Sequence, residues 1–581
     1  EKPAFMFKSG GSYRTISYGE FRDICFRIAS GLIEMVMQPG DRIAIFSQNR
    51  PEWAEADTGA LLAGAISSAI YASSLPAEAA FIIQNLDASF LFVEDSLQLE
   101  KILAIRDKIP SVKMVFVFND PFMRSDPSWI FPFSELLQEE ATPASVTKIH
   151  ELAEQIHGED TMCVIYTSGT TGNPKGVVLT HNNYIRTIEM LIEHVKDISK
   201  LKRNISFLPL AHAFERFAGY YLLLSMGSCI AYAESLETLT QNFREVKPNF
   251  LVAVPRVFEK MHARITQGVR SASILKKAIF FWALGVGKEA GRYKKSGQPF
   301  PWRLTLRHKL ADALLFKKVK AAFGGQLEFC CSGGAPLSKE IGEFFDAMDI
   351  LILEGWGATE ATTPSTFNSP HDYRFGTVGK PLPGVEVRVA SDGELEVKGP
   401  NVFKEYWRNP EETHATFTSD GFYRTGDIGE INEEGRVIIT DRKKQLIITS
   451  GGKNIAPAPI ENLLQSGRHI EMAYVHGDRR NYLTALLVLD QNAVKATAEY
   501  NGIKDCSWLE LIHHSLIMEK VQKEVDKANG ELPRFMQIKY FRILEEPFSI
   551  ESGEMTPTMK LKKRVVEEKY KDLLDSMYKE D

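Results

Sequence analysis

Hydrophobic and polar positions alternate along the chain with two periods, one typical of buried strands and one typical of helices. Short apolar runs at 42–46, 90–93 and 113–118 predict buried strands. The stretch 182–195 has apolar residues at helical spacing, and 51–64 begins with a proline, which is favoured in the first turn of a helix. Strands that alternate with helices in this way predict an α/β architecture with largely parallel sheets.

The same pattern continues to about residue 384, and it then changes. Apolar runs at 249–254, 326–331 and 350–353 still predict buried strands. Residues 385–389 and 393–398 then alternate strictly between apolar and polar, which predicts strands with one face in water. We therefore expect a β-rich subdomain after the α/β part of a large N-terminal domain.

A second, smaller pattern follows residue 441. It predicts strands at 446–449, 472–475 and 484–489, and helices at 458–464 and 508–527. This is the pattern of a small α+β domain. We place the boundary between Thr440 and Lys443, with domains at 1–440 and 442–581. No long polar linker marks the joint, which predicts a short hinge and not a long flexible linker.

The length, composition and charge of the chain exclude several classes of protein. The 581 residues are too many for one core, and 44% hydrophobic with 25% charged residues is an ordinary globular profile. A net charge of −6 gives no general attraction to nucleic acid. Residues 1–10 lack the apolar core of a signal peptide, and no apolar run approaches the length of a membrane span. We expect a cytoplasmic protein.

The six cysteines and thirteen histidines do not predict a metal site. No cysteine pair has CxxC spacing and no histidine pair has HExxH spacing. The apolar neighbours of the cysteines predict buried thiols in a reducing compartment.

One basic and apolar stretch has two interpretations. Residues 278–287 are mostly apolar and are flanked by Lys276, Lys277, Lys294 and Lys295. The first interpretation is an interfacial helix, which would give 276–295 a peripheral contact with the inner face of a membrane. The second is a surface helix that packs on the large domain.

The segment "IYTSGTTGNPKGVVLTH" at 165–181 is rich in glycine and hydroxyl residues and contains a single lysine. Glycines let backbone N–H groups approach an anion closely, and hydroxyls and Lys175 add further donors. The pattern is not that of a P-loop, in which Gly-Lys is followed by Ser or Thr at the start of a helix. Here apolar runs flank the loop, which predicts a phosphate-binding loop between two strands.

Five other segments have compositions that suit a nucleotide or its metal. They are "CSGGAP" at 331–336, "EGWGATE" at 354–360, "YRTGDIG" at 423–429, "TDRKK" at 440–444 with "GGKNIAP" at 451–457, and "MTPTMK" at 555–560. Trp356 offers a stacking face, Glu360 is a hard oxygen ligand for Mg²⁺, and Asp427 could accept both ribose hydroxyls.

Together these motifs, in this order, resemble the adenylate-forming superfamily of acyl-CoA synthetases, luciferases and adenylation domains. The resemblance covers essentially the whole chain. Three segments are similar to long-chain fatty acyl-CoA synthetases: "LPLAHAFER" at 208–216, "GGKNIAP" at 451–457 and "TPTMKLKKR" at 556–564. The resemblance implies ATP-dependent activation of a long-chain fatty acid to an acyl-adenylate, followed by transfer to coenzyme A with release of AMP and pyrophosphate.

The resemblance also implies the roles of individual residues. The β- and γ-phosphates of ATP would be held by Thr167, Ser168, Gly169, Thr170, Thr171, Gly172 and Lys175. Adenine would lie against Gly333, Gly334, Ala335, Glu354, Gly355, Trp356 and Gly357. Asp427 would bind the ribose near Arg442, Thr359 would touch the α-phosphate, and Glu360 with Thr167 would bind Mg²⁺.

The remaining implied roles concern the acyl group and coenzyme A. His212 and Phe214 would lie near the acyl pocket. Lys560 would bridge the acyl carboxylate and the α-phosphate. Gly451, Gly452 and Lys453 would line the channel for the pantetheine arm of coenzyme A. In this family the small C-terminal domain is mobile and rotates about a hinge, which the resemblance places at Asp441, so that the lysine leaves as the glycine loop enters.

Several alternatives stay open. Met559 stands where many relatives have glycine, which leaves Lys562 as an alternative to Lys560. Asn454 occupies a position that is often aromatic in long-chain enzymes.

The substrate could be another carboxylate, such as a medium-chain or aryl acid. A fatty acyl-AMP ligase that serves a carrier protein is disfavoured, because no obvious insertion follows the hinge. A non-catalytic lipid-binding protein would have no use for all these charged groups.

Overall fold

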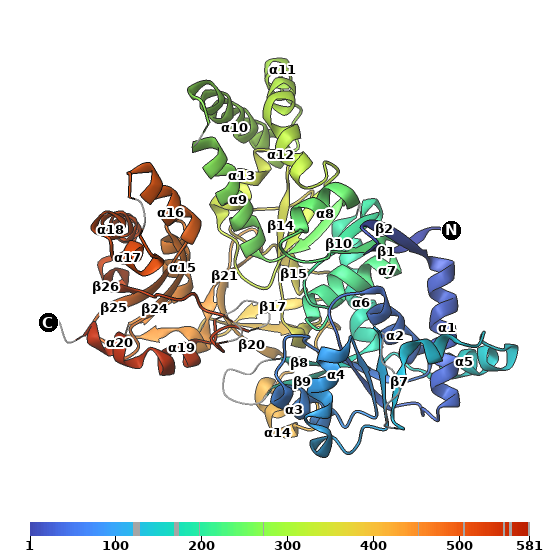
Figure 1. Ribbon diagram of the computed structural model, residues 1–581. Helices are drawn as coiled ribbons and strands as arrows, with labels where there is room; N and C mark the ends of the chain where they lie inside the picture. The colour runs from blue at the N-terminus through green and yellow to red at the C-terminus, as the bar shows by residue number, and fades with distance from the viewer. Residues whose placement is uncertain are drawn as a thin grey trace. The chain divides into compact units, whose positions relative to one another are not determined.

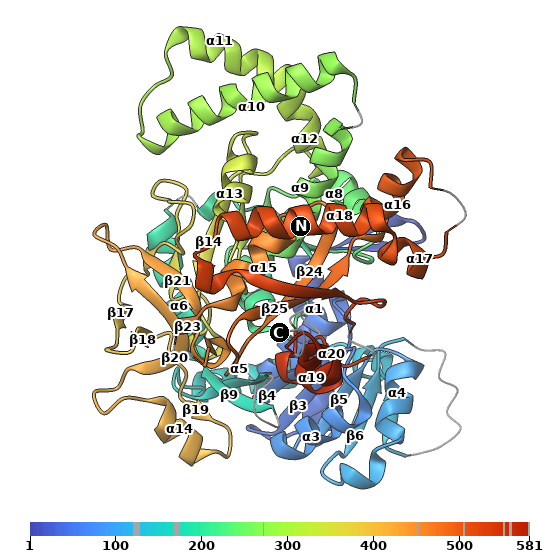
Figure 2. The ribbon, with the colours of Figure 1, turned by 90° about the vertical axis from the view of Figure 1, so that its left-hand side faces the viewer.

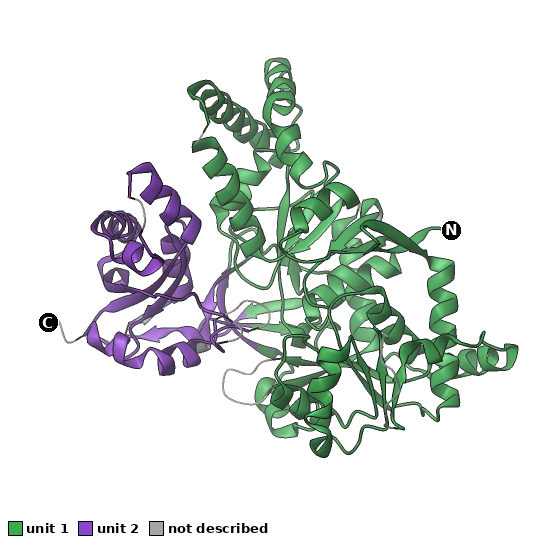
Figure 3. Cartoon of the chain, viewed as in Figure 1, with its two compact units in different colours: residues 1–388, 396–424, 431–438 green, residues 389–395, 425–430, 439–581 purple. Residues whose placement is uncertain are grey.

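The computed structural model describes residues 1–119, 128–167, 174–196, 198–270, 272–450, 453–503, 506–549, 552–556 and 561–578. The chain forms two compact units (Figure 3). Unit 1 comprises Glu1–Arg388, Glu396–Arg424 and Ile431–Ile438, and unit 2 comprises Val389–Leu395, Thr425–Glu430 and Ile439–Asp581.

The longest sheet described belongs to unit 1 and runs in the order β19-β9-β8-β4-β3-β5-β6-β7. Figure 1 labels its strands β7, β8 and β9, and Figure 2 labels β3, β4, β5 and β6. Neighbouring strands are parallel from β8 to β7, as the alternating sequence pattern predicted. In sheet order the strands span Glu405–Tyr406, Lys175–Thr180, Thr161–Thr167, Ile66–Ile70, Arg42–Phe46, Phe90–Val93, Met114–Val117 and Ile130–Pro132.

Helices connect these parallel strands, because a parallel pair needs a crossover. They are α2 (Pro51–Leu62), α3 (Pro76–Leu86) and α4 (Ser96–Leu103). Apolar residues of α3 and α4, such as Ile83 and Ile102, pack with strand residues in one fully buried cluster. The predicted helix at 51–64 is confirmed, although it ends two residues earlier than expected.

A second sheet of unit 1 runs in the order β12-β13-β14-β15-β16. Its strands span Phe250–Ala253, Phe329–Ser332, Ile352–Trp356, Thr366–Phe367 and Lys380–Pro381. Strands β12, β13 and β14 are parallel, so the loops after β13 and β14 leave the sheet at the same edge. The helices packed against this sheet include α8 (Leu239–Val246), α9 (Pro255–Arg270), α10 (Ile274–Lys295) and α13 (Lys339–Asp346).

A third sheet of unit 1 has the order β10-β11-β1-β2. Its strands span Arg203–Ser206, Cys229–Tyr232, Pro3–Ser9 and Ser12–Ser17. Helix α1 (Tyr18–Glu34) packs on α2, and η4 (Glu215–Tyr221) packs near β10. Further helices of unit 1 are α5 (Pro143–Gln155), α6 (His181–Val195), α7 (Leu222–Ser225), α11 (Trp302–Ala311), α12 (Lys317–Ala322) and α14 (Pro410–Thr416).

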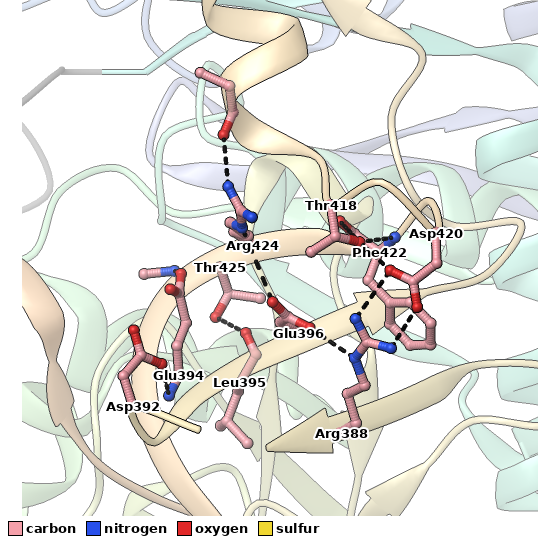
Figure 4. Close-up of polar contacts among 12 residues, drawn as sticks. Arg388, Asp392, Glu394, Leu395, Glu396, Thr418, Asp420, Phe422, Arg424 and Thr425 are labelled. Atoms are coloured by element: carbon pink, nitrogen blue, oxygen red, sulfur yellow. Dashed lines mark hydrogen bonds and ion pairs between the residues drawn. The ribbon is translucent and has the colours of Figure 1, made fainter. Parts of the chain in front are cut away.

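Strands β17 (Glu386–Val389), β18 (Glu394–Lys398), β20 (Tyr423–Ile431) and β21 (Val437–Arg442) form the predicted β-rich part. The expectation of a wet face on 393–398 is wrong, because Glu394 and Glu396 are both buried. Figure 4 shows the partner that stabilises the buried carboxylate of Glu396. Nε of Arg388 donates a hydrogen bond of 2.6 Å to Glu396, and the same guanidinium also donates to the carboxylate of Asp420. Within unit 2, Lys443 donates to Glu394 at 2.7 Å.

Unit 2 contains a sheet of order β24-β25-β26, with strands Ile470–His476, Leu483–Leu489 and Ile538–Ile543. Helix α15 (Pro457–Gln465) packs on β24, and α16 (Gln491–Tyr500) packs near α17 and α18. The predicted helix at 508–527 is two helices, α17 (Trp508–His513) and α18 (Ser515–Gly530). They are separated at His514, whose extended backbone and ring nitrogen cap the start of α18.

The fold class predicted from the sequence, α/β with a smaller α+β domain, is confirmed. The prediction of buried thiols is confirmed for five of the cysteines, whereas Cys506 is exposed. Within the described residues, no helix is long and apolar enough to cross a bilayer.

Candidate functional site

The predicted phosphate loop connects two antiparallel strands. β8 and β9 pair along their length, and their last pair is Thr167 with Lys175. The predicted arrangement of strand, loop and strand is therefore confirmed. Thr167 and Lys175 begin and end the loop, whereas Ser168, Gly169, Thr170, Thr171 and Gly172 lie outside the described residues.

A tyrosine lies between two of the predicted site residues. β19 pairs with β9, which brings the Tyr406 ring under the ammonium of Lys175, 5.3 Å from the ring centroid. The Tyr406 hydroxyl donates a hydrogen bond of 2.8 Å to Oε1 of Glu360. Burial and the neighbouring Glu360 carboxylate raise the pKa of Tyr406, so it stays a neutral donor. The structure thus brings Lys175 and Glu360 to one aromatic side chain, with the ammonium over the ring and the carboxylate at the hydroxyl.

Glu360 is fixed by its backbone as well as by Tyr406. It lies in the short helix η6 (Thr359–Ala361), which also contains Thr359. Its carbonyl accepts a hydrogen bond of 2.7 Å from the N–H of Phe403, in the segment that leads into β19. The same segment therefore holds both the main chain and the carboxylate of Glu360.

Lys175 has a carboxylate partner that the sequence did not predict. Glu412 on α14 forms a close ion pair with the Lys175 ammonium. The side chains are 22% and 38% exposed, so water screens this pair only in part. An anion bound at the loop would compete with Glu412 for the same ammonium.

The predicted adenine residues lie at the carboxyl edge of the second sheet. Ser332 of β13 pairs with Glu354 of β14, so the 333–335 loop begins beside the 354–357 segment. Ligands of open α/β sheets bind at such strand ends. A Cβ at Gly355 would lie 2.7 Å from the ring of Phe367, so this position requires glycine. The structure brings Gly333, Gly334, Ala335, Glu354, Gly355, Trp356 and Gly357 to one edge.

The side chain of Glu354 contacts the neighbouring loop. It is buried and accepts a hydrogen bond of 3.1 Å from the N–H of Leu337. Burial raises the pKa of Glu354 to about 7, while the N–H groups of Leu337 and Gly376 favour the carboxylate. This carboxyl group therefore fixes the end of the 333–337 loop.

His212 and Phe214 lie beside the same loop. A Cβ at Gly333 would stand 3.0 Å from the Phe214 ring, which places the ring against that glycine. The N–H of Phe214 donates to Nδ1 of His212 at 3.2 Å, so a neutral imidazole carries its proton on Nε2. The predicted acyl and adenine segments are thus neighbours in unit 1.

The predicted ribose residues lie in unit 2. Asp427 is buried, and its Oδ1 is 3.0 Å from Nε of Arg442. The expectation that Arg442 lies near Asp427 is confirmed in this geometry. Asp441, the predicted hinge, is buried, and its Oδ1 accepts from the N–H of Arg442 at 2.6 Å. Burial raises the pKa of Asp441.

The predicted coenzyme A loop comes between two short paired strands in the chain. β22 (Ile447–Ile448) and β23 (Asn454–Ile455) are antiparallel, and Lys453 donates its N–H to Thr449 at 3.2 Å. The Lys453 ammonium lies 4.1 Å from the centroid of the Phe535 ring. Gly451, Gly452 and Lys560 lie outside the described residues.

The chemistry of the donor set fits Mg²⁺. Within the described part of the chain, no group of three His, Cys, Asp or Glu side chains is placed to hold a metal ion. Magnesium in nucleotide enzymes is commonly bound by one or two carboxylates together with substrate phosphates. Glu360, which is held by Tyr406 next to the phosphate loop, fits that form of binding.

Comparisons with known proteins identify the family of the chain. The model of the AMP-binding enzyme family matches residues 1–407, and the model of the AMP-binding enzyme C-terminal domain matches residues 444–581. The chain belongs to the AMP-binding enzyme family. As the motifs predicted, this AMP-binding enzyme is a member of the adenylate-forming superfamily.

Curated relatives cover nearly the whole chain. A long-chain-fatty-acid–CoA ligase of Mycobacterium bovis is 33% identical over 95% of this chain and 90% of its own length. A long-chain-fatty-acid–CoA ligase of Xenopus laevis is 31% identical over 99% of this chain and 82% of its own. The similarity to long-chain acyl-CoA synthetases that three sequence segments predicted is therefore confirmed.

Solved structures share the fold at lower identity. An anthranilate CoA ligase in complex with anthranoyl-AMP has a TM-score of 0.74 at 17% identity and covers 99% of this chain and 95% of its own. ATP-bound MatB from Rhodopseudomonas palustris has a TM-score of 0.70 at 23% identity, with coverage of 99% and 96%. At these identities the likeness establishes the fold of the AMP-binding enzyme.

Proposed function

We propose that this AMP-binding enzyme activates a long-chain fatty acid with ATP and transfers the acyl group to coenzyme A. The products are acyl-CoA, AMP and pyrophosphate. The observation that carries the proposal is the arrangement of Lys175, Tyr406 and Glu360 around the phosphate loop. The names of the curated relatives support a long-chain acid over an aryl or medium-chain acid.

Charge stabilisation is the main requirement of the first half-reaction. The fatty acid carboxylate attacks the α-phosphate of ATP, which brings two anions together and releases a third. Lys175 would hold the departing pyrophosphate, and Lys560 would bridge the attacking carboxylate and the α-phosphate. Mg²⁺ held by Glu360 and Thr167 would neutralise phosphate charge when bound. No proton transfer is needed in this step.

The second half-reaction requires a different set of groups. The thiolate of coenzyme A attacks the acyl carbonyl and expels AMP, which forms the thioester. We propose that the C-terminal domain, residues 442–581, turns about Asp441, which would remove Lys560 and bring in Gly451, Gly452 and Lys453. The domains would then be 1–440 and 442–581. Asp427 and Arg442, which already form an ion pair, would hold the ribose.

Product analysis tests the proposed reaction. The protein is incubated with ATP, Mg²⁺, coenzyme A and fatty acids of increasing length, and pyrophosphate, AMP and acyl-CoA are measured. We expect one of each product per turnover and the highest kcat/KM with long-chain acids such as palmitate. ADP and phosphate as products would refute the proposal. A preference for benzoate or octanoate would refute the substrate class, and adenylate without thioester would identify an acyl-AMP ligase.

Neutralising Glu412 is expected to strengthen ATP binding. The Glu412→Gln variant removes the carboxylate that competes with phosphate for Lys175. A partly exposed pair of this kind is worth up to about 1 kcal/mol, so we expect KM for ATP to fall about two- to fivefold. KM is measured from pyrophosphate release at saturating fatty acid.

Glu411 provides the matched control for this change. It neighbours Glu412 on α14 and is exposed, and Glu411→Gln removes the same charge without removing the partner of Lys175. We expect KM for ATP to be unchanged in this variant. A higher KM in Glu412→Gln alone would show that Glu412 positions Lys175 for the nucleotide.

A further inference from the structure

The basic and apolar stretch around residue 280 is part of a pair of helices. α10 and α11 lie side by side at one end of unit 1 (Figures 1 and 2). Phe280, Ala283 and Val286 of α10 are buried in one cluster with Leu304 and Ala311 of α11. The centre of this stretch therefore packs on the large unit, as the second of the two interpretations predicted.

The outer surface of α11 has a row of exposed apolar side chains. Residues 302, 306, 310 and 314 are spaced by four, so they follow one side of the helix and its continuation η5 (Asp312–Phe316). A helix that packs only on protein would have polar residues there. The exposed fractions are 68% for Trp302, 59% for Leu306, 53% for Leu310 and 38% for Leu314.

α10 adds apolar residues outside its buried face. Phe281 is 64% exposed although its neighbour Phe280 is buried, and the first residues of the helix, Ile274 and Leu275, are 86% and 71% exposed. Exposed aromatic and aliphatic groups of this size on adjacent helices are costly in water unless a partner covers them.

The same helices hold an excess of positive charge. Residues 274–320 contain twelve Lys and Arg but two Asp and Glu, a net charge of +10 in a chain whose net charge is −6. Some of these cations pair internally, such as Arg307 with Glu289 and Lys294 with Asp349. Arg303, Lys309 and Lys318 are exposed, and no described acidic side chain pairs with them.

We propose that this helical surface docks on the face of an anionic lipid bilayer. The docking surface is defined by Trp302, Leu306, Leu310 and Leu314 together with Arg303, Lys309 and Lys318, and the neighbouring helix α10 adds the exposed apolar residues Ile274, Leu275 and Phe281. The apolar side chains would enter the boundary between headgroups and acyl chains, and the cations would bind anionic headgroups. Docking uses none of the proposed catalytic residues and would bring the enzyme to the phase in which long-chain acids dissolve.

Charge and composition favour a bilayer over other occupants. A second copy would bring the same positive surface against this one, which is repulsive. A nucleic acid would use the cations, but contacts to phosphate give no role to a row of leucines. A bilayer with anionic lipids uses both kinds of side chain.

Vesicle binding by the full chain, without substrates, tests the proposal. We expect binding to vesicles of phosphatidylglycerol and phosphatidylcholine, and much weaker binding to phosphatidylcholine alone. Reversing three charges, in Arg303→Glu/Lys309→Glu/Lys318→Glu, is expected to weaken binding at least about 100-fold, because each cation near an anionic surface contributes about 1 kcal/mol. Leu306→Gln/Leu310→Gln is expected to weaken it at least about tenfold through lost apolar burial.

Matched variants elsewhere on the surface are the controls. Lys148→Glu/Lys495→Glu/Lys571→Glu makes the same charge change at exposed positions, and Leu97→Gln/Leu103→Gln removes two exposed leucines of α4. Both should bind vesicles as the unchanged protein does. Brominated lipids should quench part of the tryptophan fluorescence, and Trp302→Phe should remove most of that quenching while binding persists.

Four results would overturn the proposal. They are no binding of the unchanged protein to anionic vesicles, equal binding of all variants, duplex DNA binding that depends on the cations but not on the leucines, and self-association that is lost in Leu306→Gln/Leu310→Gln. Pyrophosphate release from a soluble acid is measured separately on every variant. If neither the unchanged protein nor any variant released pyrophosphate, the proposed reaction would be refuted, and the vesicle experiment would still decide the docking proposal.

Discussion

Replacing Lys560 by alanine is expected to slow formation of the acyl-adenylate by about 10²–10³-fold, the usual cost of losing one charge-stabilising donor. Formation of acyl-CoA from supplied acyl-adenylate should be unchanged, because the bridging charge is needed only while carboxylate and α-phosphate are joined. The two half-reactions are measured separately, the first as fatty-acid-dependent pyrophosphate exchange into ATP and the second as thioester formed from synthetic acyl-AMP.

Lys562 is the control that the sequence offers for Lys560. Met555 and Leu561, which lie on either side of Lys560 in the chain, form an antiparallel β-bridge. The N–H of Lys562 donates to the carbonyl of Glu554 at 2.7 Å. The Lys562→Ala variant is expected to retain adenylation. A larger loss in Lys562→Ala would assign the role to Lys562, and equal losses in both half-reactions of Lys560→Ala would remove the proposed role.

The strands and the hairpin that depend on local interactions could be predicted from the sequence. The parallel strands at 42–46 and 90–93 could be predicted because their burial on both faces produces continuous apolar runs. The hairpin around the phosphate loop could be predicted because both flanking segments are apolar and the residues between them favour a turn. The nearness of the 333–335 and 354–357 segments follows from two adjacent parallel strands.

The sequence could not identify partners that come from distant parts of the chain. Tyr406 and Glu412 are more than 200 residues from Lys175, and nothing in their neighbourhood signals a role at the phosphate loop. The alternation at 393–398 predicted a solvent-exposed face, and this prediction was wrong. Glu394 and Glu396 are buried because they pair with cations from another strand and from the 443–445 turn, which the local pattern does not reveal. The separation of α17 and α18 depends on one backbone conformation at His514.

The segment "LPLAHAFER" illustrates how a motif can combine two roles. The Phe214 ring lies against Gly333 of the predicted adenine segment, whereas Glu215 and Arg216 are completely buried in η4. Glu215 accepts a hydrogen bond of 2.6 Å from Ser206, and burial raises its pKa to about 8. A Cβ at Gly219 would lie 2.4 Å from the Glu215 carboxylate, so the helix leaves room for this side chain.

Removing the Arg216 side chain is expected to destabilise the protein by about 3–5 kcal/mol, the usual cost of leaving one member of a buried ion pair without its partner. Arg216 and Asp57 are both completely buried and form an ion pair, and Ser67 and Tyr221 also donate to Asp57. In Arg216→Met the Asp57 carboxylate would keep these two hydroxyl donors and lose its only described countercharge. The loss is measured as the shift of the urea unfolding midpoint, followed by tryptophan fluorescence.

Two further variants separate the buried charge from general damage to the core. Asp57→Leu/Arg216→Met removes both charges and is expected to recover a large part of the loss, because no buried ion remains unpaired. Arg186→Ala breaks an exposed pair with Glu189, whose side chains are 57% and 56% exposed, and should cost less than about 1 kcal/mol. If Arg216→Met cost no more than Arg186→Ala, the buried pair would not stabilise η4. Loss of long-chain activity in the double variant at unchanged ATP binding would then show that the pair positions His212 and Phe214, since both precede η4 directly.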